Sequence, residues 1–208
     1  YNHYNYLDSG RNPAKRNMFL ARNGLYAPHR YPILYAGSSE ISWEGLREIS
    51  SSTLSASNIG VSFWSHDVGG NHGGVEESEL YIRYVELGCF SPILRFHAAR
   101  GVYYKREPWR WDVKTETIVN DYLRFRHRLI PYLYTESYRY YKEGKCLVEP
   151  FYYRYPWVID DNKYRYQYFF GKELLICPIT KKKDLTMNRT IHEFYIPSSS
   201  GIANLHCM

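Results

Sequence analysis

The chain has 208 residues, 44% of them hydrophobic, and a formal net charge of +6. This composition argues against a disordered chain. No apolar stretch approaches the roughly 20 residues that a membrane-spanning helix needs, so we expect no membrane partner. The 27 basic residues are spread along the sequence instead of forming a patch, and we therefore expect no nucleic-acid partner.

The predicted elements of the first 144 residues alternate between strands and helices. Short apolar runs predict strands at 17–24, 31–37, 59–70 and 92–98. Apolar residues at helical spacing predict helices at 41–58, where the pattern later turns loop-like, at 76–90, with a capping-type acidic start, and at 115–143, closed by Gly144. Such alternation is typical of an α/β fold with a parallel sheet.

The sequence changes character after Gly144. Three β-rich runs separated by Pro, Asp and Asn turns follow it, at 145–156, 166–180 and 191–197. We therefore place a domain boundary near Gly144, between an α/β domain over 1–144 and an antiparallel β domain over 145–208.

The four cysteines predict neither a disulfide framework nor a zinc site. They lie far apart, without a C-x-x-C pair, at Cys89, Cys146, Cys177 and Cys207. Most of them stand in apolar runs, as buried reduced thiols do. This pattern favours a cytoplasmic location.

The densest polar cluster follows the third predicted strand, in the segment FWSHDVGGNHGG. A metal site would use His66, Asp67 and His72, with His97 as an optional fourth ligand, but the spacing of this motif matches no common zinc template. The glycines do not follow the common phosphate-binding patterns either, so we expect no metal and no cofactor. Two interpretations remain. The first is a tight turn whose polar groups satisfy buried backbone. The second is a sugar site in which Trp64 stacks on a pyranose while His66 and Asp67 bond its hydroxyls.

Two further polar residues stand at strand ends. Arg22 ends the first predicted strand and His97 ends the fourth. The carboxyl ends of parallel strands meet at one rim, where α/β folds place their chemistry. We therefore expect both residues beside Asp67, although a structural role for His97 stays open.

Five ordered motifs give the chain a resemblance to glycoside hydrolase family 31, the α-glucosidase and α-xylosidase group, over residues 1–197. The motifs are HRYPILYAGSSEISWEGL, SASNIGVSFWSHDVGG, ELYIRYVELGCFSPILRFHAARG, REPW and RHRLIPYLYTESY. The resemblance implies a partial (β/α)8 TIM barrel. Residues 1–144 would form its strands five to eight, and residues 145–208 would begin the β-sandwich domain that follows it.

The resemblance also implies retaining hydrolysis of O-glycosyl bonds, in which one carboxylate attacks the anomeric carbon and a second carboxyl protonates the leaving oxygen. The family's nucleophile lies in a W-x-D-x-x-E-like motif on the fourth barrel strand. This sequence lacks that motif, so we expect a fragment without the nucleophile. Ser38 stands at the acid/base aspartate of the family pattern YSGDTxxSW, and a serine hydroxyl is too weak an acid for this task. Glu40 would miss that position by about 6–7 Å along an extended chain, so we do not expect it to substitute.

The resemblance further implies which residues bind the substrate, an α-glucoside or related oligosaccharide. Arg22, Trp64, Asp67 and His97 match positions that line the sugar subsite at the cleaved bond. Tyr35 stands on the sixth strand, where many relatives carry an aromatic residue. Together with His66 of the polar cluster, these residues form the predicted substrate-binding set.

Two alternatives to a hydrolase fragment stay open. Ser38 is consistent with a catalytically inactive pseudoenzyme that only binds carbohydrate. Four strands are too few to close a barrel. They would therefore leave two open edges. The chain would then be a half-barrel subunit whose partner supplies the missing N-terminal half.

Overall fold

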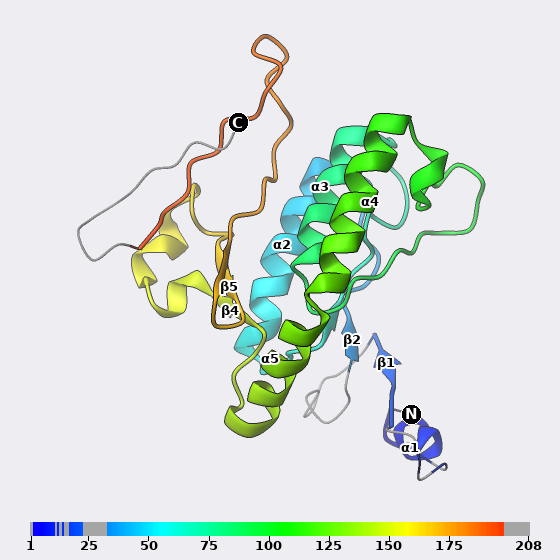
Figure 1. Cartoon of the computed structure of the whole chain (residues 1–208), viewed down its shortest axis with the longest axis vertical. Helices are drawn as coiled ribbons and strands as arrows, with labels where there is room; N and C mark the ends of the chain where they lie inside the picture. Colours follow the sequence, from blue (N-terminus) through cyan, green and yellow to red (C-terminus); the bar gives the residue numbers. More distant parts are fainter. Residues whose placement is uncertain (1, 11, 13, 15–16, 23–32, 198–208) are drawn as a thin grey trace.

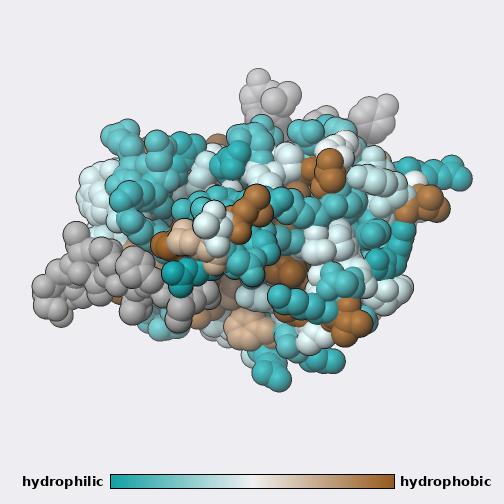
Figure 2. Space-filling model, turned by 90° about the horizontal axis from the view of Figure 1, so that it is seen from above, coloured by the Kyte–Doolittle hydropathy of each residue, from teal (hydrophilic) through white to brown (hydrophobic). Residues whose placement is uncertain are grey.

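The computed structural model describes residues 2–10, 12, 14, 17–22 and 33–197 of the chain. Parts of the strands predicted at 17–24 and 31–37, and the end of the domain predicted at 145–208, lie outside these residues. Within the described ranges, no helix combines the length and apolar character needed to cross a membrane. Figure 2 shows a face on which hydrophobic residues are scattered in small groups among hydrophilic ones.

A parallel sheet forms from short strands in chain order. Helix α1 (Asn2–Ser9) precedes the strands β1 (Leu20–Ala21), β2 (Ile33–Tyr35) and β3 (Trp64–Ser65). Strand β2 lies between β1 and β3, and both pairings are parallel. The alternation of strand and helix therefore gives the α/β fold that the sequence predicts.

The segment predicted as a fourth strand, 92–98, follows β3 in the same direction without becoming a regular strand. It is joined to the end of β3 by two isolated parallel bridges, Ser65–Ile93 and Val68–Phe96. The Val68 amide donates to the Arg95 carbonyl at 3.0 Å. The prediction is therefore correct in position and direction, but the pairing is interrupted between the bridges.

Helix α2 (Trp43–Asn58) follows β2 and is longer than its sequence suggests. The Ser42 side chain caps its first turn by accepting from the Gly45 amide at 2.9 Å. The serine- and threonine-rich second half, predicted to turn loop-like, is helical. There the Ser50 and Thr53 hydroxyls donate to the carbonyls four residues earlier, at 2.8 and 2.7 Å. These local bonds satisfy hydroxyl groups that would otherwise compete with the helix backbone.

Three further helices pack beside or after α2 (Figure 1). They are α3 (Ser78–Cys89), α4 (Val113–Arg128) and α5 (Ile130–Glu143), with a short 3-10 turn η2 (Pro108–Arg110) before α4. The acidic start predicted for α3 provides no side-chain cap, because the Glu77 carboxylate pairs with Lys182 at 2.7 Å instead.

The single helix predicted at 115–143 is two helices. The break falls at Leu129, and Pro131 stands in the first turn of α5. Proline has no N–H to donate and disfavours helical backbone before it. Gly144 closes α5 in the left-handed conformation, with φ of 71°, as its sequence position predicts.

A second, antiparallel sheet follows Gly144. Its strands are β4 (Val148–Pro150), β5 (Tyr168–Phe170) and β6 (Leu174–Ile176), in that spatial order. The 3-10 turns η3 (Phe151–Tyr153) and η4 (Pro156–Asp160) connect β4 to β5. In the described chain, no regular strand forms over 191–197. The Gln167 side chain nevertheless bonds both backbone groups of Tyr195, at 2.7 and 2.9 Å.

One hydrophobic core spans both sides of Gly144. It joins buried residues of α2 and α3 to residues of the second sheet, among them Leu46, Ile49, Tyr84, Val148 and Phe170. The Ser57 hydroxyl of α2 also donates to the Val148 carbonyl at 2.6 Å. The change in sequence character near Gly144 is therefore not a break in packing.

Arg126 connects α4 to the end of α3. Its buried guanidinium donates to the carbonyls of Cys89, Ser91 and Pro92, at 2.7, 2.8 and 2.8 Å. These carbonyls end α3 and begin the segment 92–98, so one side chain fixes where that segment starts. A buried guanidinium and the carbonyls it satisfies depend on each other, because none of them can turn to water instead.

The substitution Arg126→Met tests this connection. It leaves the three carbonyls without their donor, and we expect the free energy of unfolding to fall by about 3 kcal/mol. The matched control is Arg124→Met on the same helix, whose guanidinium is 69% exposed and paired with Asp121; it should change stability by less than about 0.5 kcal/mol. Urea unfolding followed by circular dichroism measures both, and equal losses would contradict the assigned role.

Candidate active site

The loops that follow β2, β3 and the segment 92–98 meet at one rim. The backbone amide of Asn71 donates to the Ser39 carbonyl at 2.8 Å, and the backbone carbonyl of Asn71 accepts from the Ala99 amide, also at 2.8 Å. A further bond runs from the Ile41 amide to the His72 carbonyl at 3.0 Å. Residue 71 thus connects all three loops through its own backbone.

Asp67 lies at the centre of this rim, and its side chain has no exposed surface. Its Oδ2 accepts from the Tyr35 hydroxyl at 2.6 Å and from the Asn71 side-chain amide at 2.7 Å. Its Oδ1 is paired with the Arg95 guanidinium. That guanidinium also lies over the Tyr35 ring, 4.5 Å from the ring centroid. Side chains from three consecutive strand ends therefore converge on one buried carboxylate.

Ser38 stands beside this group. Its Oγ is 3.4 Å from the Tyr35 hydroxyl, whose pKa is raised by burial and by the hydrogen bond to Asp67. Arg22 approaches from β1, since a Cβ placed on Gly37 would lie 3.6 Å from its guanidinium. The structure thus brings Tyr35, Ser38 and Asp67 together. Arg22 lies beside Gly37, the residue that precedes Ser38.

Glu40 follows β2, His97 lies in the segment 92–98, and both residues are exposed. The Glu40 carboxylate faces Gly73 of the glycine-rich loop, because a Cβ on Gly73 would lie 3.8 Å from its Oε1. The Glu40 carbonyl accepts from Tyr84 at 3.2 Å. In the described part of the chain, no hydrogen bond connects the Glu40 carboxylate with Ser38 or Asp67.

Trp64 and His66 do not join the group around Asp67. Successive side chains of a strand point to opposite faces, and these two point toward the helices. Trp64 packs against a small apolar cluster that includes Ala56 of α2. His66 has no exposed surface, and its Nε2 is bonded to Ser91 at 2.8 Å. The predicted stacking of Trp64 on a sugar and the predicted contact of His66 with its hydroxyls do not fit this arrangement.

The glycine-rich loop is held by Arg106 of the REPW motif. The guanidinium donates to the Gly70 carbonyl at 2.8 Å and pairs with Glu76 at 2.9 Å. A Cβ on Gly69 would come within 2.9 Å of the Arg106 side chain. Glycine is therefore required at position 69 for this close approach. The Arg106 guanidinium thus holds the loop that carries Asn71 in place.

Two residues of the rim, Arg95 and Asn71, are absent from the predicted set. The signal for Arg95 is present in LRFHA, because a charged residue interrupts an apolar strand two positions before His97 and so shares its face. Asn71 offers no comparable signal in the sequence. Its role depends on how the glycines bend the loop back toward Asp67.

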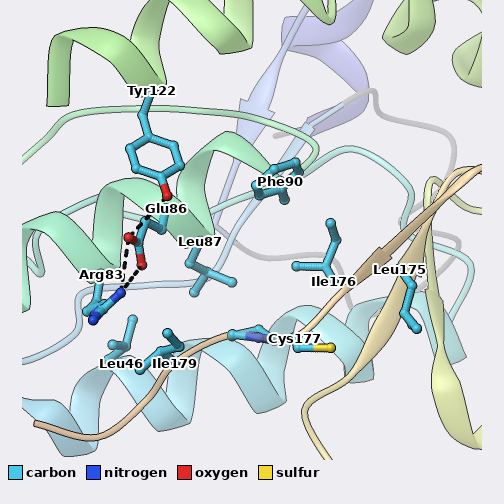
Figure 3. A pocket seen from close by; sticks show the side chains of 11 residues that line it. Leu46, Arg83, Glu86, Leu87, Phe90, Tyr122, Leu175, Ile176, Cys177 and Ile179 are labelled. Carbon is cyan, nitrogen blue, oxygen red and sulfur yellow. Dashed lines mark hydrogen bonds and ion pairs between the residues drawn. The ribbon is translucent and has the colours of Figure 1, made fainter. Parts of the chain in front are cut away.

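The cavity shown in Figure 3 lies elsewhere, between α2, α3, α4 and the segment after β6. It has a volume of about 450 Å³, and none of the rim residues lines it. At one end, Arg83 pairs with Glu86 at 2.9 Å, and Tyr122 donates to the same carboxylate at 3.2 Å. In the described ranges, no three His, Cys, Asp or Glu side chains are grouped to hold a metal ion.

Comparison with known proteins points to one family. Residues 2–136 match the description "Glycosyl hydrolases family 31 TIM-barrel domain". The chain is 31% identical over 193 residues to alpha-glucosidase 2 of Bacillus thermoamyloliquefaciens, covering 90% of this chain and 23% of that protein. It is 30% identical over 191 residues to the alpha-xylosidase of Saccharolobus solfataricus, covering 88% of this chain and 25% of that protein.

A solved structure gives the same result. The cycloalternan-forming enzyme of Listeria monocytogenes, in complex with a pentasaccharide substrate, is similar with a TM-score of 0.80 and 29% identity. The match covers 93% of this chain and 18% of that enzyme. The chain thus spans at most 25% of the length of each of these relatives.

The pH dependence of stability tests the buried state of His66. Burial lowers the pKa of this imidazole from its ordinary 6.5 to about 4. Between these values the unfolded chain binds a proton that the folded chain does not, so the free energy of unfolding falls as the pH falls. The slope from this one group is up to about 1.4 kcal/mol per pH unit.

We expect His66→Gln to remove this part of the slope between pH 6.5 and pH 4, whatever its effect at pH 7. The control is His3→Gln, at an exposed histidine of α1, which should keep it. Urea titrations at several pH values measure the slopes. A His66→Gln chain with the unaltered slope would show that His66 is not held neutral.

Proposed function

Because the chain belongs to glycosyl hydrolase family 31, we propose that residues 1–144 supply strands five to eight of a (β/α)8 catalytic barrel. Residues 145–208 then begin the β-sandwich domain after it. The parallel order β1-β2-β3, continued by the segment 92–98, supports this proposal. The antiparallel pairing of β4, β5 and β6 is the change of architecture that such a boundary requires.

The proposed reaction is retaining hydrolysis of α-glucosides, with Ser38 at the position of the general acid/base. A retaining glycosidase needs two carboxyl groups about 5–5.5 Å apart. The observation that carries the proposal is the position of Ser38, which follows β2 and lies beside Tyr35, the partner of Asp67. The resemblance to the family motif puts the acid/base aspartate at this position. The nucleophile would come from a part of the barrel outside these 208 residues.

Glu40 does not take over the acid role in this proposal. Its carboxylate faces Gly73, whereas proton transfer requires an acid within hydrogen-bond reach of the leaving oxygen. Catalytic groups tolerate displacements of only about 0.5 Å from their productive position. The chain would therefore contribute substrate binding to the barrel and little proton transfer.

The proposed ligand is an α-glucoside or a related oligosaccharide. The relatives are named for α-glucosides and α-xylosides, and one neighbouring structure holds a pentasaccharide substrate. Of the predicted binding residues, Arg22, Tyr35, Asp67 and His97 remain in the proposed rim. Trp64 and His66 are not part of it, because their side chains face the helices.

A second candidate function uses the same rim: the chain would be a half-barrel subunit that binds sugar without turnover. The observation that favours it is the open sheet. Within the described chain, β1 pairs only with β2, and the segment 92–98 pairs only with β3 and the residues after it. Unpaired edges of a parallel sheet demand a partner, which is either the first half of the barrel or another chain that carries it.

The substitution Ser38→Asp tests the acid/base assignment. A completed barrel is supplied by a hybrid in which this chain replaces the matching segment of the Bacillus alpha-glucosidase. We expect Ser38→Asp to raise kcat on methyl α-D-glucopyranoside by about 10²–10⁴-fold, the usual contribution of a general acid. The control Ser55→Asp adds the same charge at an exposed position of α2 and should leave the rate unchanged.

Two outcomes would contradict the assignment. Equal rates with and without Ser38→Asp would show that position 38 is not the acid/base position. Loss of the residual rate on Glu40→Gln, with no gain from Ser38→Asp, would make Glu40 the acid.

A further inference from the structure

We propose that Asp67 is a positioning residue, and that Arg95 and Tyr35, which it orients, are the residues that meet the ligand. The inference rests on the proposed function, because it assumes that this rim binds a sugar. It changes which side chains recognise the ligand, since it replaces a direct contact of Asp67 with one made through Arg95.

The Asp67 carboxylate is closed to any ligand. It has no exposed surface even with the sheet open on both sides. Oδ1 is paired with Arg95, while Oδ2 accepts two hydrogen bonds, from Tyr35 at 2.6 Å and from Asn71 at 2.7 Å. A sugar hydroxyl could reach this carboxylate only by displacing one of the three donors. Each displacement would leave a buried donor or charge without its partner.

Arg95 has donors left after these contacts. Its Nη2 is used by Asp67 and its Nε donates to the Ser65 hydroxyl at 3.3 Å, while 26% of the side chain remains exposed. In the part of the chain that the structure describes, no bond is recorded for Nη1. A guanidinium carries five N–H donors, so the exposed donors of Arg95 can serve the hydroxyl oxygens of a sugar.

Tyr35 completes this donor group. The Arg95 guanidinium lies 4.5 Å from the Tyr35 ring centroid, so the two side chains hold each other in place. The Tyr35 hydroxyl gives its proton to Asp67 and keeps a lone pair toward Ser38, 3.4 Å away. It can therefore accept from a ligand hydroxyl at Ser38. Asp67 holds both side chains in this arrangement before any ligand arrives, which lowers the cost of ordering them on binding.

Asn71 makes the arrangement rigid. Its side chain bonds Asp67, while its backbone bonds Ser39 and Ala99. A displacement of Asp67 must therefore also move the loops that carry Ser38 and His97. This connection explains why a buried carboxylate stands at the rim of a binding surface.

A double-mutant cycle on the full chain tests the proposal. The probe is methyl α-D-glucopyranoside, and its Kd is measured by ligand-observed NMR for the unaltered chain, Arg95→Lys, Asp67→Asn and the double variant. We expect Arg95→Lys to weaken binding by about tenfold or more, because lysine cannot reproduce the fork of a guanidinium. Asp67→Asn should weaken binding by a smaller factor. The double variant should bind within about twofold of Arg95→Lys alone, because Asp67 acts through Arg95.

If the two single effects multiply in the double variant, Asp67 meets the sugar directly and the proposal is wrong. The matched control is the exposed pair Asp121–Arg124, at 3.0 Å, where Asp121→Asn and Arg124→Lys should leave Kd unchanged. Circular dichroism confirms that each variant is folded.

Nuclear Overhauser effects provide a second test, which begins with the unaltered chain. With the probe bound to the unaltered chain, nuclear Overhauser effects from sugar protons to the Arg95 guanidinium and the Tyr35 ring support the proposal, and their absence in the bound state contradicts it. If the unaltered chain binds no probe, the proposed function fails. The Arg95 resonances then decide the positioning role alone. Slow rotation of the guanidinium that becomes fast in Asp67→Asn supports it, and rotation that is unaffected overturns it.

Discussion

The rim of this protein depends on one buried charge. The Asp67 carboxylate is removed from water and is compensated by the Arg95 guanidinium, the Tyr35 hydroxyl and the Asn71 amide. Removal of one partner from a buried ion pair typically costs about 3–5 kcal/mol. Because the partners stand on β2, on the loop after β3 and on the segment 92–98, this single group fixes three consecutive strand ends relative to one another.

The surrounding structure serves to hold these strand ends. Arg126 fixes the start of the segment 92–98 through the carbonyls at the end of α3. Arg106 fixes the glycine-rich loop through the Gly70 carbonyl. Both guanidiniums are buried, and each satisfies backbone groups that the helices and strands leave without partners. Two buried guanidiniums thus hold the rim on its helix side.

The sequence predicts where the rim lies better than it predicts which side chains face it. Apolar runs followed by polar residues place Tyr35, Ser38 and Asp67 together, because parallel strands end at one edge. The same pattern cannot show that Trp64 and His66 face the helices, since that depends on which strand residue points inward. Asn71 escapes prediction because its role arises from the fold of a glycine loop. For the helices, spacing fails at Leu129, where Pro131 starts a new helix, and in the serine-rich half of α2.

The most direct test of the central claim is amide hydrogen exchange of the three loops, 36–42, 67–72 and 96–100, in the unaltered chain and in Asp67→Ala. Exchange reports local opening of cooperative units. If the buried carboxylate joins the strand ends, loss of the side chain makes all three loops exchange faster together, while α4 remains protected. Faster exchange confined to 67–72 would contradict the account, because it would show that Asp67 orders only its own loop.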